Sequence, residues 1–577
     1  MEHMTEDEKV LHQMGYAQEL QRRMGAFQNF AISFAIICIV AGGLTAFPVA
    51  LSAGGGASIG LVWPLGSAFA LLVAAAMGQV ASSYPTAGGI YHWSSMLGGR
   101  GFGWAAAWFN LLGLMFVVSS VNMGLFLLFR DLFLAQVVGM DVSSWVPNGE
   151  FSGGWWVQTS FITAATIIQA ILNHYFLRLT TILTDWSGYI ILATGVVLTL
   201  ALFAFAPSHD FSRLFHFQNF TGETGGNVWP QAQVGIYVFL IGLLHAVYTI
   251  TGFDASAHTS EETRDAQKEV PKGMLRSVFW SFVFGYAMVC AMVLALPDQK
   301  DAAGNVTMDG VTAGAAQGWN SFFWLMGQVP FPGWLRALII IGIVVSNFLC
   351  ALAGLTSCSR MMYAFARDGG LPASDSLKKV DAHLRTPGAA IWVGGALSVV
   401  ATLYGGAFLI LSTGCAVFLY LSYLMPIAAA MKSEMDGKWK QKGPFNLGGA
   451  SIPIAALAVI GCAVLIFVGV QPPQEKVGYL IVLMIVAMIG FWQSMEGRMP
   501  IGLLFSALTA AAVWYFWRDP ESNFGVYAGV VVLIVMAILT FMLNGKRFAG
   551  PPIGDEIKKR QAAIAAAEKA LDAAEAR

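Results

Sequence analysis

The segment Tyr248–Glu262 reads YTITGFDASAHTSEE and follows an apolar run that begins at Ile236. It places a Thr-Gly pair, a carboxylate and several hydroxyls where a membrane helix should still be apolar. Irregular backbone inside a membrane is tolerated only where it is buried in protein or lines a cavity, and an intramembrane acid such as Asp254 indicates function. The segment therefore predicts an interrupted spanning helix with a site beside it. The alternative is that the span ends near Gly252 and a cytoplasmic helix begins there.

The composition is typical of a polytopic membrane protein. Of the 577 residues, 56% are hydrophobic and only 11% are charged. The six cysteines lie in apolar runs without metal-ligand spacing, so we expect neither a metal site nor disulfides. No Walker motif, Rossmann fingerprint or nucleic-acid-binding pattern is present, so we expect no cofactor and no nucleic-acid partner. A paired acid and base, an activated nucleophile or a metal cluster would indicate an enzyme, and none is visible.

Apolar segments long enough to cross a bilayer, about 20 residues each, recur along the chain and predict about fourteen spans. They lie at 29–50, 62–82, 103–133, 157–177, 183–206, 233–258, 275–296, 335–366, 388–404, 407–428, 453–470, 477–494, 501–517 and 525–543. With the N-terminus in the cytoplasm, most of the 32 Lys and Arg residues fall inside, and the outer ones are Arg130, Arg213, Lys300, Arg336, Lys476 and Arg518. This bias predicts a multi-pass protein of the plasma membrane (the inner membrane in a bacterium) with both termini cytoplasmic.

The chain divides into four predicted parts. They are a cytoplasmic N-terminal segment at 1–28, a core of ten spans at 29–428, peripheral spans at 429–545 and a cytoplasmic tail at 546–577. The first part has the composition of a short amphipathic helix on the inner surface, and the tail reads as a solvated, Ala-rich helix. Long outer loops at 207–232 and 297–334 have room for short helices or gate elements.

A second interruption is predicted in the first span. Gly42-Gly43 lies in its middle and Pro48 follows, and both residue types weaken a helix. Interrupted spans in matching positions of two halves, here spans one and six, indicate the site of an inverted-repeat transporter. Amides freed at a break bind a substrate carboxylate, and freed carbonyls bind an ammonium or a cation. The alternative for the glycines is close helix packing.

Other polar residues in the spans have two readings each. Asn110 and Asn122 suit either interhelical hydrogen bonds or substrate contacts. His245 suits packing or a proton relay, and Asp185 suits a helix cap or a proton carrier. Phe253 suits an aromatic lid over the substrate or ordinary core packing.

Two acids follow the interruption in span six. We expect Glu261 and Glu262 to pair with Arg or Lys of neighbouring inner loops. Such pairs would close an inner gate, although exposed pairs contribute little to stability.

Four ordered motifs resemble the amino acid/choline permease branch of the amino acid–polyamine–organocation superfamily, over roughly residues 15 to 500. They are Gly15–Leu20 with Arg22-Arg23 and Phe30–Phe34, Ser82–Trp93, Thr251–Thr263 with Val270–Gly273, and Tyr363–Pro372. The resemblance implies an all-α, leucine-transporter-like fold of five plus five inverted spans, with helices one and six broken. It also implies alternating access and amino acids, GABA or related amines as substrates.

The resemblance assigns the substrate site to the two breaks. In the first, the implied binding residues are Ala41, Gly42, Gly43 and Leu44, and in the second they are Thr251, Gly252, Phe253 and Asp254. Many relatives have twelve spans, so the last two predicted here are expected to be peripheral. Relatives commonly carry an acid where this chain has Gln79.

The coupling ion stays open between Na⁺, H⁺ and exchange. Ala353, Thr356 and Ser357 resemble the segment that supplies a sodium site in related symporters. Small hydroxyl residues are also ordinary packing material in membrane helices. Protons or exchange are more usual in the superfamily.

The sequence thus predicts a secondary transporter, a symporter or antiporter, for a small-molecule amino acid or related amine in a lipid bilayer. One alternative is a polyamine or choline carrier, which would use Asp254 to bind the cation. The other is a membrane receptor that transports nothing. Neither the substrate nor the oligomeric state follows from the sequence.

Overall fold

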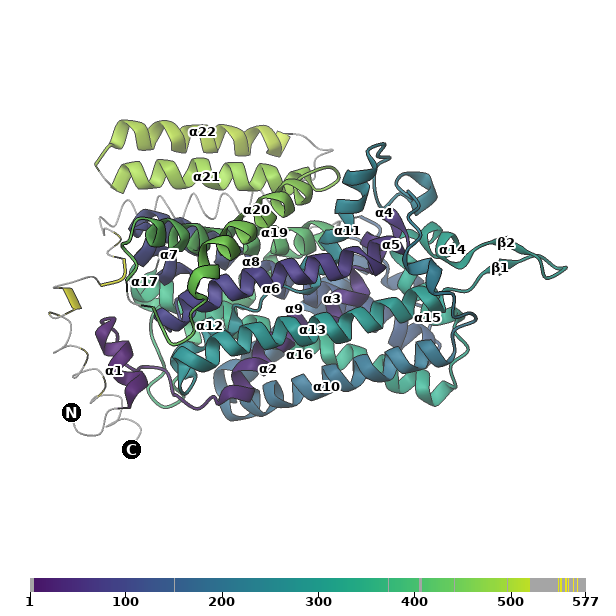
Figure 1. Ribbon diagram of the computed structural model, residues 1–577, viewed down its shortest axis with the longest axis horizontal. Coiled ribbons are helices and arrows are strands. Elements are labelled where there is room, and N and C mark those ends of the chain that lie inside the picture. The colour runs from purple at the N-terminus through teal and green to yellow at the C-terminus, as the bar shows by residue number, and fades with distance from the viewer. Residues whose placement is uncertain are drawn as a thin grey trace.

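The computed structural model is a bundle of long helices with a two-stranded hairpin projecting from one end (Figure 1). It describes residues 5–518, apart from 150, 372, 404–406, 441 and 496, together with isolated residues between 548 and 568. Among these residues, nine helices are long and apolar enough to cross a membrane. The predicted span at 525–543 and most of the tail at 546–577 lie outside the described residues.

The first five predicted spans are all observed as helices. They are α2 (Ala26–Ile37) with α3 (Ile39–Thr45), α6 (Val62–Ser83), α8 (Arg100–Leu128), α9 (Gly153–Tyr175) and α10 (Leu177–Ala204). A π-helical segment, Phe129–Val138, continues α8 without a gap. The connections contain α4 (Phe47–Gly54), α5 (Ala57–Gly60) and α7 (Ile90–Gly98).

The next five spans repeat this order. They are α11 (Gly235–Thr249) with α12 (Ala255–His258), α13 (Ala266–Ala295), α16 (Gly333–Arg367), α18 (Gly388–Ala401) and α19 (Ala407–Met435). Equivalent members of the two sets pack against each other, namely α6 with α13, α8 with α16, and α9 with α18. The first helix of each set is the interrupted one, and the two run in opposite directions through the bundle. This is the arrangement of an inverted repeat.

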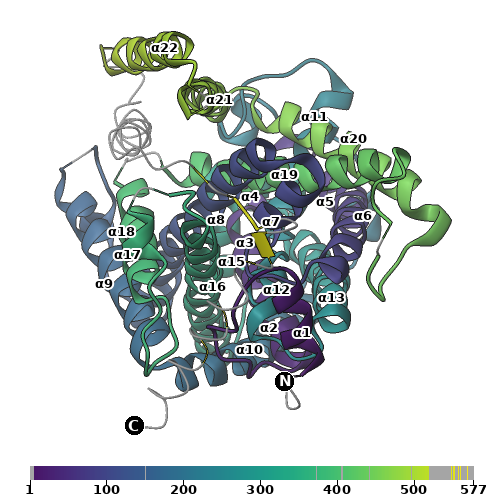
Figure 2. The same ribbon diagram turned by 90° about the vertical axis from the view of Figure 1, so that its left-hand side faces the viewer.

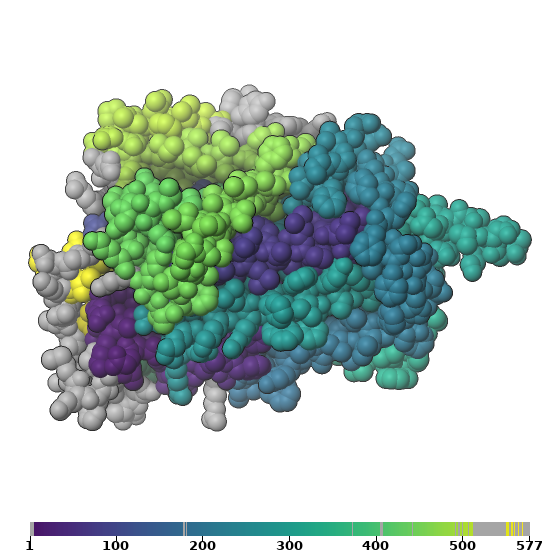
Figure 3. Space-filling view, in the orientation of Figure 1, coloured from purple at the N-terminus to yellow at the C-terminus, as the bar shows by residue number. Residues whose placement is uncertain are grey.

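Three further helices complete the described bundle. They are α20 (Ser451–Gly469), α21 (Glu475–Met495) and α22 (Met499–Arg518), and α21 and α22 lie outermost on one side (Figure 1). The loop before α20 is fastened to α6, because Gln79 accepts from the Leu447 amide at 2.8 Å and donates to the Ser451 hydroxyl at 2.7 Å. Figure 3 shows this green loop lying against the purple surface. Gln79 therefore joins α6 to α20.

We call the end of the bundle that holds residues 5–24, the head segment, the head end. The head segment contains α1 (Glu6–Gln13), which the Thr5 side chain caps, and it lies over one part of this end (Figure 3). Another short helix, α17 (Ser374–Leu377), follows α16 at the same end. The opposite end, the hairpin end, carries β1 (Gln299–Lys300), β2 (Val306–Met308), α14 (Gly310–Ala316) and α15 (Ser321–Gln328). The long loops predicted for this end therefore do contain short helices.

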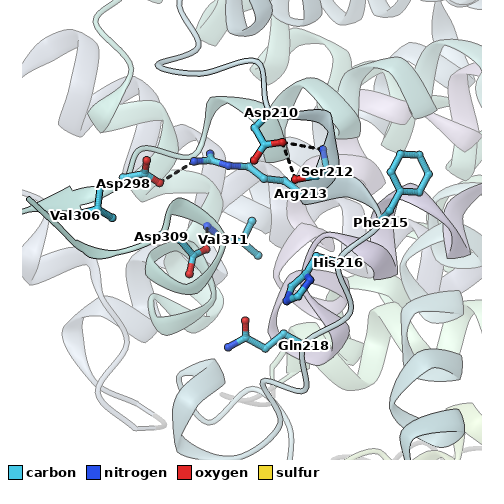
Figure 4. Close-up of a pocket in the computed structure, with 10 residues that line it drawn as sticks. All are labelled: Asp210, Ser212, Arg213, Phe215, His216, Gln218, Asp298, Val306, Asp309 and Val311. Carbon is cyan, nitrogen blue, oxygen red and sulfur yellow. Dashed lines mark hydrogen bonds and ion pairs between the residues drawn. The ribbon is translucent and has the colours of Figure 1, made fainter.

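The two loops of the hairpin end are tied together around a pocket of about 580 Å³. Arg213 belongs to this tie: its guanidinium lies 2.7 Å from Asp298 (Figure 4). The same guanidinium donates to the carbonyl of Leu296 at the end of α13. The same loop lies so close to Gly56 that a Cβ there would overlap the Arg213 carbonyl oxygen. The loops are thus fastened over the ends of the first, second and seventh spans.

Candidate functional site

The first interruption lies at Cys38, not at Gly42-Gly43 as predicted. Cys38 has left-handed backbone angles (φ 33°, ψ 80°) and separates α2 from α3, whereas both glycines lie inside α3. Their small size serves packing: a Cβ on Gly42 would lie 2.8 Å from the Cα of Thr249 in α11. The predicted position of the break is therefore wrong, because helix contact rather than local helix weakness explains the glycines.

The second interruption lies where it was predicted. α11 ends at Thr249 and α12 begins at Ala255, and Gly252 between them adopts φ 80°, a left-handed conformation that favours glycine. A side chain on Gly252 would also overlap Ile36 of α2. α12 is buried rather than solvated, so the alternative that a cytoplasmic helix simply starts here is wrong.

The two interrupted helices meet at their interruptions. The Ser33 hydroxyl of α2 donates to the Phe253 carbonyl at 2.7 Å. His245 of α11 places Nε2 3.1 Å from the Gly43 carbonyl oxygen of α3. Viewed along the bundle, α3 and α12 lie in the middle of a ring of helices (Figure 2). His245 thus joins the two broken helices, which is the packing alternative of the sequence analysis.

The residues assigned to the substrate site surround this meeting point. Ala41 and Leu44 are buried in α3. Phe253 packs its ring against Tyr423, with centroids 5.0 Å apart, and so is held inside the protein by α19. The Thr251 hydroxyl is buried and has no hydrogen-bond partner among the described residues. An unpaired buried hydroxyl costs about 1–3 kcal/mol, so the second break carries a polar group that no described residue satisfies.

Asp254 already accepts hydrogen bonds from its own protein. Tyr423 donates to Oδ1 at 2.7 Å, and Asn110 donates to Oδ2 at 3.0 Å. His258 Nε2 lies 3.0 Å from the same Oδ2. Because these three groups already contact the carboxylate, the structure gives no support to Asp254 as a direct binder of a cationic substrate.

Sequence reasoning missed two members of this cluster. The spacing of Asp254 and His258, four residues apart, places them on one helix face and was a usable signal. Tyr423 comes from α19, 169 residues away in the chain, and carried no such signal. Of the two asparagines considered, Asn110 contacts the break, whereas Asn122 of α8 donates to Thr166 and Gln169 of α9 and so joins two helices.

The two acids after α12 pair with arginines of α16. Glu261 lies 2.9 Å from Arg367, and Glu262 lies 2.8 Å from Arg360. The Ala87 amide also donates to Glu261 at 3.0 Å. Pairing with basic residues is confirmed, but Arg360 comes from within a helix rather than from a loop. Since Glu261 and Arg360 are almost completely buried, both pairs are screened little by solvent.

The head segment adds a layer that the sequence did not predict. Tyr16 donates to Asp368 at 2.7 Å, and the Arg367 guanidinium lies 4.0 Å from the centre of its ring. Burial, reinforced by Asp368, raises the pKa of Tyr16 well above its ordinary value, so the phenol keeps its proton. Arg22 donates to the carbonyls of Ser260 and Thr263 beside the two acids. The head segment therefore covers the ion pairs.

Three of the residues proposed for cation coupling, Ala353, Thr356 and Ser357, lie in α16, which packs against α2 and α3. The Thr356 hydroxyl of α16 donates to the Asn173 side chain of α9, whereas the buried Ser357 hydroxyl has no partner among the described residues. Ala353 is buried in the same helix. Asp185 does not cap a helix, because α10 begins at Leu177, and it accepts instead from Gln28 of α2 at 3.2 Å.

A helical bundle with two interrupted spanning helices in contact at its centre defines the class of membrane transport proteins built on inverted repeats. A family model described as amino acid permease matches residues 25–492. The chain belongs to this amino acid permease family, and its function is amino-acid transport.

Relatives of the chain carry the same description. An amino-acid permease of Arabidopsis thaliana (BAT1) is 31% identical over 78% of this chain and 85% of its own length. Amino-acid permease 2 of Neurospora crassa is 27% identical over 85% of this chain and 88% of its own. The GABA-specific permease of Saccharomyces cerevisiae is 26% identical over 82% and 79%. The resemblance drawn from the motifs is thereby confirmed.

Proposed function

We propose that the chain carries a zwitterionic amino acid or GABA across the plasma membrane by alternating access, with the substrate bound at the two helix breaks. The observation that carries the proposal is that the breaks at Cys38 and Ile250–Asp254 are buried, and that Ser33 and Ile36, just before the first break, contact Phe253 and Gly252 of the second. Main-chain amides and carbonyls freed at such breaks bind a carboxylate and an ammonium without charged side chains. The head end is then cytoplasmic, in keeping with its many Lys and Arg residues.

The ion pairs Glu261–Arg367 and Glu262–Arg360 are the inner gate in this proposal. They join the turn that follows α12, Ser260–Glu262, to α16, which has no break. The substrate can leave towards the cytoplasm only when α12 separates from α16. At the hairpin end, the ion pair between Arg213 and Asp298 has the same role. It ties together the loops that lie over the ends of the first, second and seventh spans and so closes the outer side.

The first experiment is counterflow exchange in proteoliposomes loaded with unlabelled L-alanine, L-glutamate, L-lysine or GABA. Uptake of the same labelled compound, without any ion gradient, is expected for one or more of them. No exchange with any amino acid or with putrescine and choline, from protein shown to be folded, would reject transport in favour of a receptor. Exchange of putrescine or choline alone would favour the amine carrier.

A substitution of Thr251 tests whether the substrate binds at the second break. Thr251→Val keeps the shape of the side chain and removes the unpaired hydroxyl. If that hydroxyl contacts the substrate, its loss costs about 1–2 kcal/mol, which raises the exchange KM about 5- to 30-fold. Thr199→Val is the matched control, because the Thr199 hydroxyl donates only to the Gly195 carbonyl of its own helix. An unchanged KM in Thr251→Val would remove this residue from the site.

A further inference from the structure

His258 in the Asp254 cluster has hydrogen-bond acceptors at both ring nitrogens. Nε2 lies 3.0 Å from Asp254 Oδ2, and Nδ1 lies 3.1 Å from the carbonyl oxygen of Ala87. The side chains of His258 and Asp254 are both fully buried. A neutral imidazole has one N–H and donates to one acceptor, whereas an imidazolium donates to both. The geometry therefore suits an imidazolium beside a carboxylate.

Tyr423 and Asn110 also donate hydrogen bonds to Asp254. Tyr423 accepts the Gly252 amide at 3.2 Å, so its own hydroxyl proton points to Asp254. If the carboxyl instead takes the proton from Nε2, His258 keeps its N–H towards Ala87 and accepts a hydrogen bond from the acid. The imidazolium–carboxylate pair and the imidazole–carboxylic acid pair each hold one proton more than a carboxylate beside a neutral imidazole. With that extra proton, both contacts of the His258 ring are hydrogen bonds.

The surroundings offer no other counter-charge to this pair among the described residues. Asn110 of α8 and the phenols Tyr423 and Tyr420 of α19 are its uncharged neighbours, and α2 contributes Ser33 and Asn29. The charged groups on the other packed elements have ionic partners of their own, namely Arg367 with Glu261, Arg360 with Glu262, Lys272 with Glu269, and Lys268 with Asp265. His92 contacts the rings of Tyr16 and Tyr84 and makes no hydrogen bond among the described residues. Asp254 and His258 therefore balance each other.

A continuous set of hydrogen bonds joins the pair to the inner gate. The Ala87 peptide faces His258 with its carbonyl and donates its N–H to Glu261, the partner of Arg367. At the other end, Tyr423 connects Asp254 to the Gly252 amide within the break. A movement of α12 away from Ala87 thus breaks the Nδ1 contact and the gate contact together.

We propose that Asp254 and His258 bind a transported proton, which is held while the head end is closed and is released when that end opens. This inference rests on the proposed function and names its coupling ion. Opening replaces the Ala87 carbonyl at Nδ1 with water, and the imidazolium gives its proton to that water, which leaves a neutral imidazole beside the Asp254 carboxylate. One proton then crosses with each substrate molecule, in the same direction, which makes the chain a proton symporter.

The test uses the full chain in proteoliposomes and the amino acid that shows the fastest counterflow. The interior is made one pH unit more alkaline, and valinomycin with equal K⁺ clamps the membrane potential at zero. One proton per substrate then supports up to about tenfold accumulation, because a pH unit is worth as much as a tenfold concentration ratio. An internal pH dye should report acidification that depends on the substrate. A wild-type protein that exchanges substrate but neither accumulates it nor moves protons would overturn the proposal and leave the proposed function standing.

His258→Gln and Asp254→Asn then assign the proton to the pair. His258→Gln keeps hydrogen-bonding groups at this position but removes the imidazolium, so counterflow at equal pH should continue while accumulation falls from about tenfold to onefold; Asp254→Asn, which changes the second break itself, should also lose accumulation. The matched control is His209→Gln, an exposed histidine of the hairpin-end loop, which should accumulate like the wild type.

Two outcomes would contradict this assignment. Either variant accumulating substrate like the wild type would show that the buried pair is structural, as many buried ion pairs are. If both variants fail to fold, uptake by the wild-type protein is measured instead with an imposed Na⁺ gradient at equal pH. Accumulation there, without substrate-dependent acidification under the pH gradient, would likewise overturn proton coupling.

Discussion

Two adjacent glycines allow the contact between the broken helices to be tested with one type of substitution. A Cβ on Gly42 would lie 2.8 Å from the Thr249 Cα, which is backbone. A Cβ on Gly43 would lie at the same 2.8 Å from Met288 Cε, the free end of a flexible side chain. Only Gly42→Ala therefore forces α3 and α11 apart, whereas Gly43→Ala displaces a methyl group. Both replacements gain the same helix propensity, so this term cancels.

The expected loss of uptake in each variant follows from the free-energy cost of overpacking. Forcing an extra methyl group against a fixed backbone costs about 1–3 kcal/mol, which lowers kcat/KM for uptake about 5- to 150-fold if it falls on the transport cycle. Gly43→Ala should stay within about 13-fold of the wild type, since volume changes that side chains absorb cost less than about 1.5 kcal/mol. Initial uptake rates at equal protein density, with thermal unfolding midpoints in detergent, measure both. Equal losses in the two variants, or a larger loss in Gly43→Ala, would refute the close contact.

Two further predictions concern the second break and the inner gate. Gly252→Ala should lower both the unfolding midpoint and the uptake rate, because a left-handed conformation costs an L-residue about 1–2 kcal/mol and the new methyl group overlaps Ile36. Arg367→Gln leaves Glu261 buried without its partner and should cost about 3–5 kcal/mol of stability, read as a lower midpoint. Lys378→Gln, which breaks an exposed pair, is its control and should cost at most about 1 kcal/mol.

Two results would contradict the predictions for Gly252 and Arg367. A Gly252→Ala protein with the wild-type midpoint and uptake would show that the break tolerates a side chain. An Arg367→Gln variant as stable as Lys378→Gln would show that the buried gate pair contributes no more than a surface pair does.

The second break could be predicted because its cause is local. The polar residues around Gly252 are unsuitable for a lipid-facing helix, and glycine supplies the left-handed angle that the turn needs. The pairing of Glu261 and Glu262 was also predictable, because buried acids need basic partners and inner loops are rich in them.

The first break could not be placed from local signals. Gly42-Gly43 looks weaker as helix than Cys38 does, yet the chain is left-handed at Cys38 and helical at the glycines. Tertiary packing decides the position of the first break, because Gly42 must remain in α3 to fit against Thr249. The partners of Asp254 were hidden for a related reason, since Asn110 and Tyr423 lie 144 and 169 residues away along the chain.

The covering of the inner gate by the head segment also has a consequence for biosynthesis. Arg22 and its acceptor Thr263 are separated by 241 residues. At roughly 5–20 residues per second, a ribosome needs about 12–48 s to make that interval. During this time the earliest-made segment waits at the membrane surface, and Arg22 lacks the carbonyl groups of Ser260 and Thr263 that later accept its hydrogen bonds. The docking of Arg22 therefore becomes possible only after the sixth span has been made, and a nascent chain that stalls before Thr263 keeps its head segment undocked.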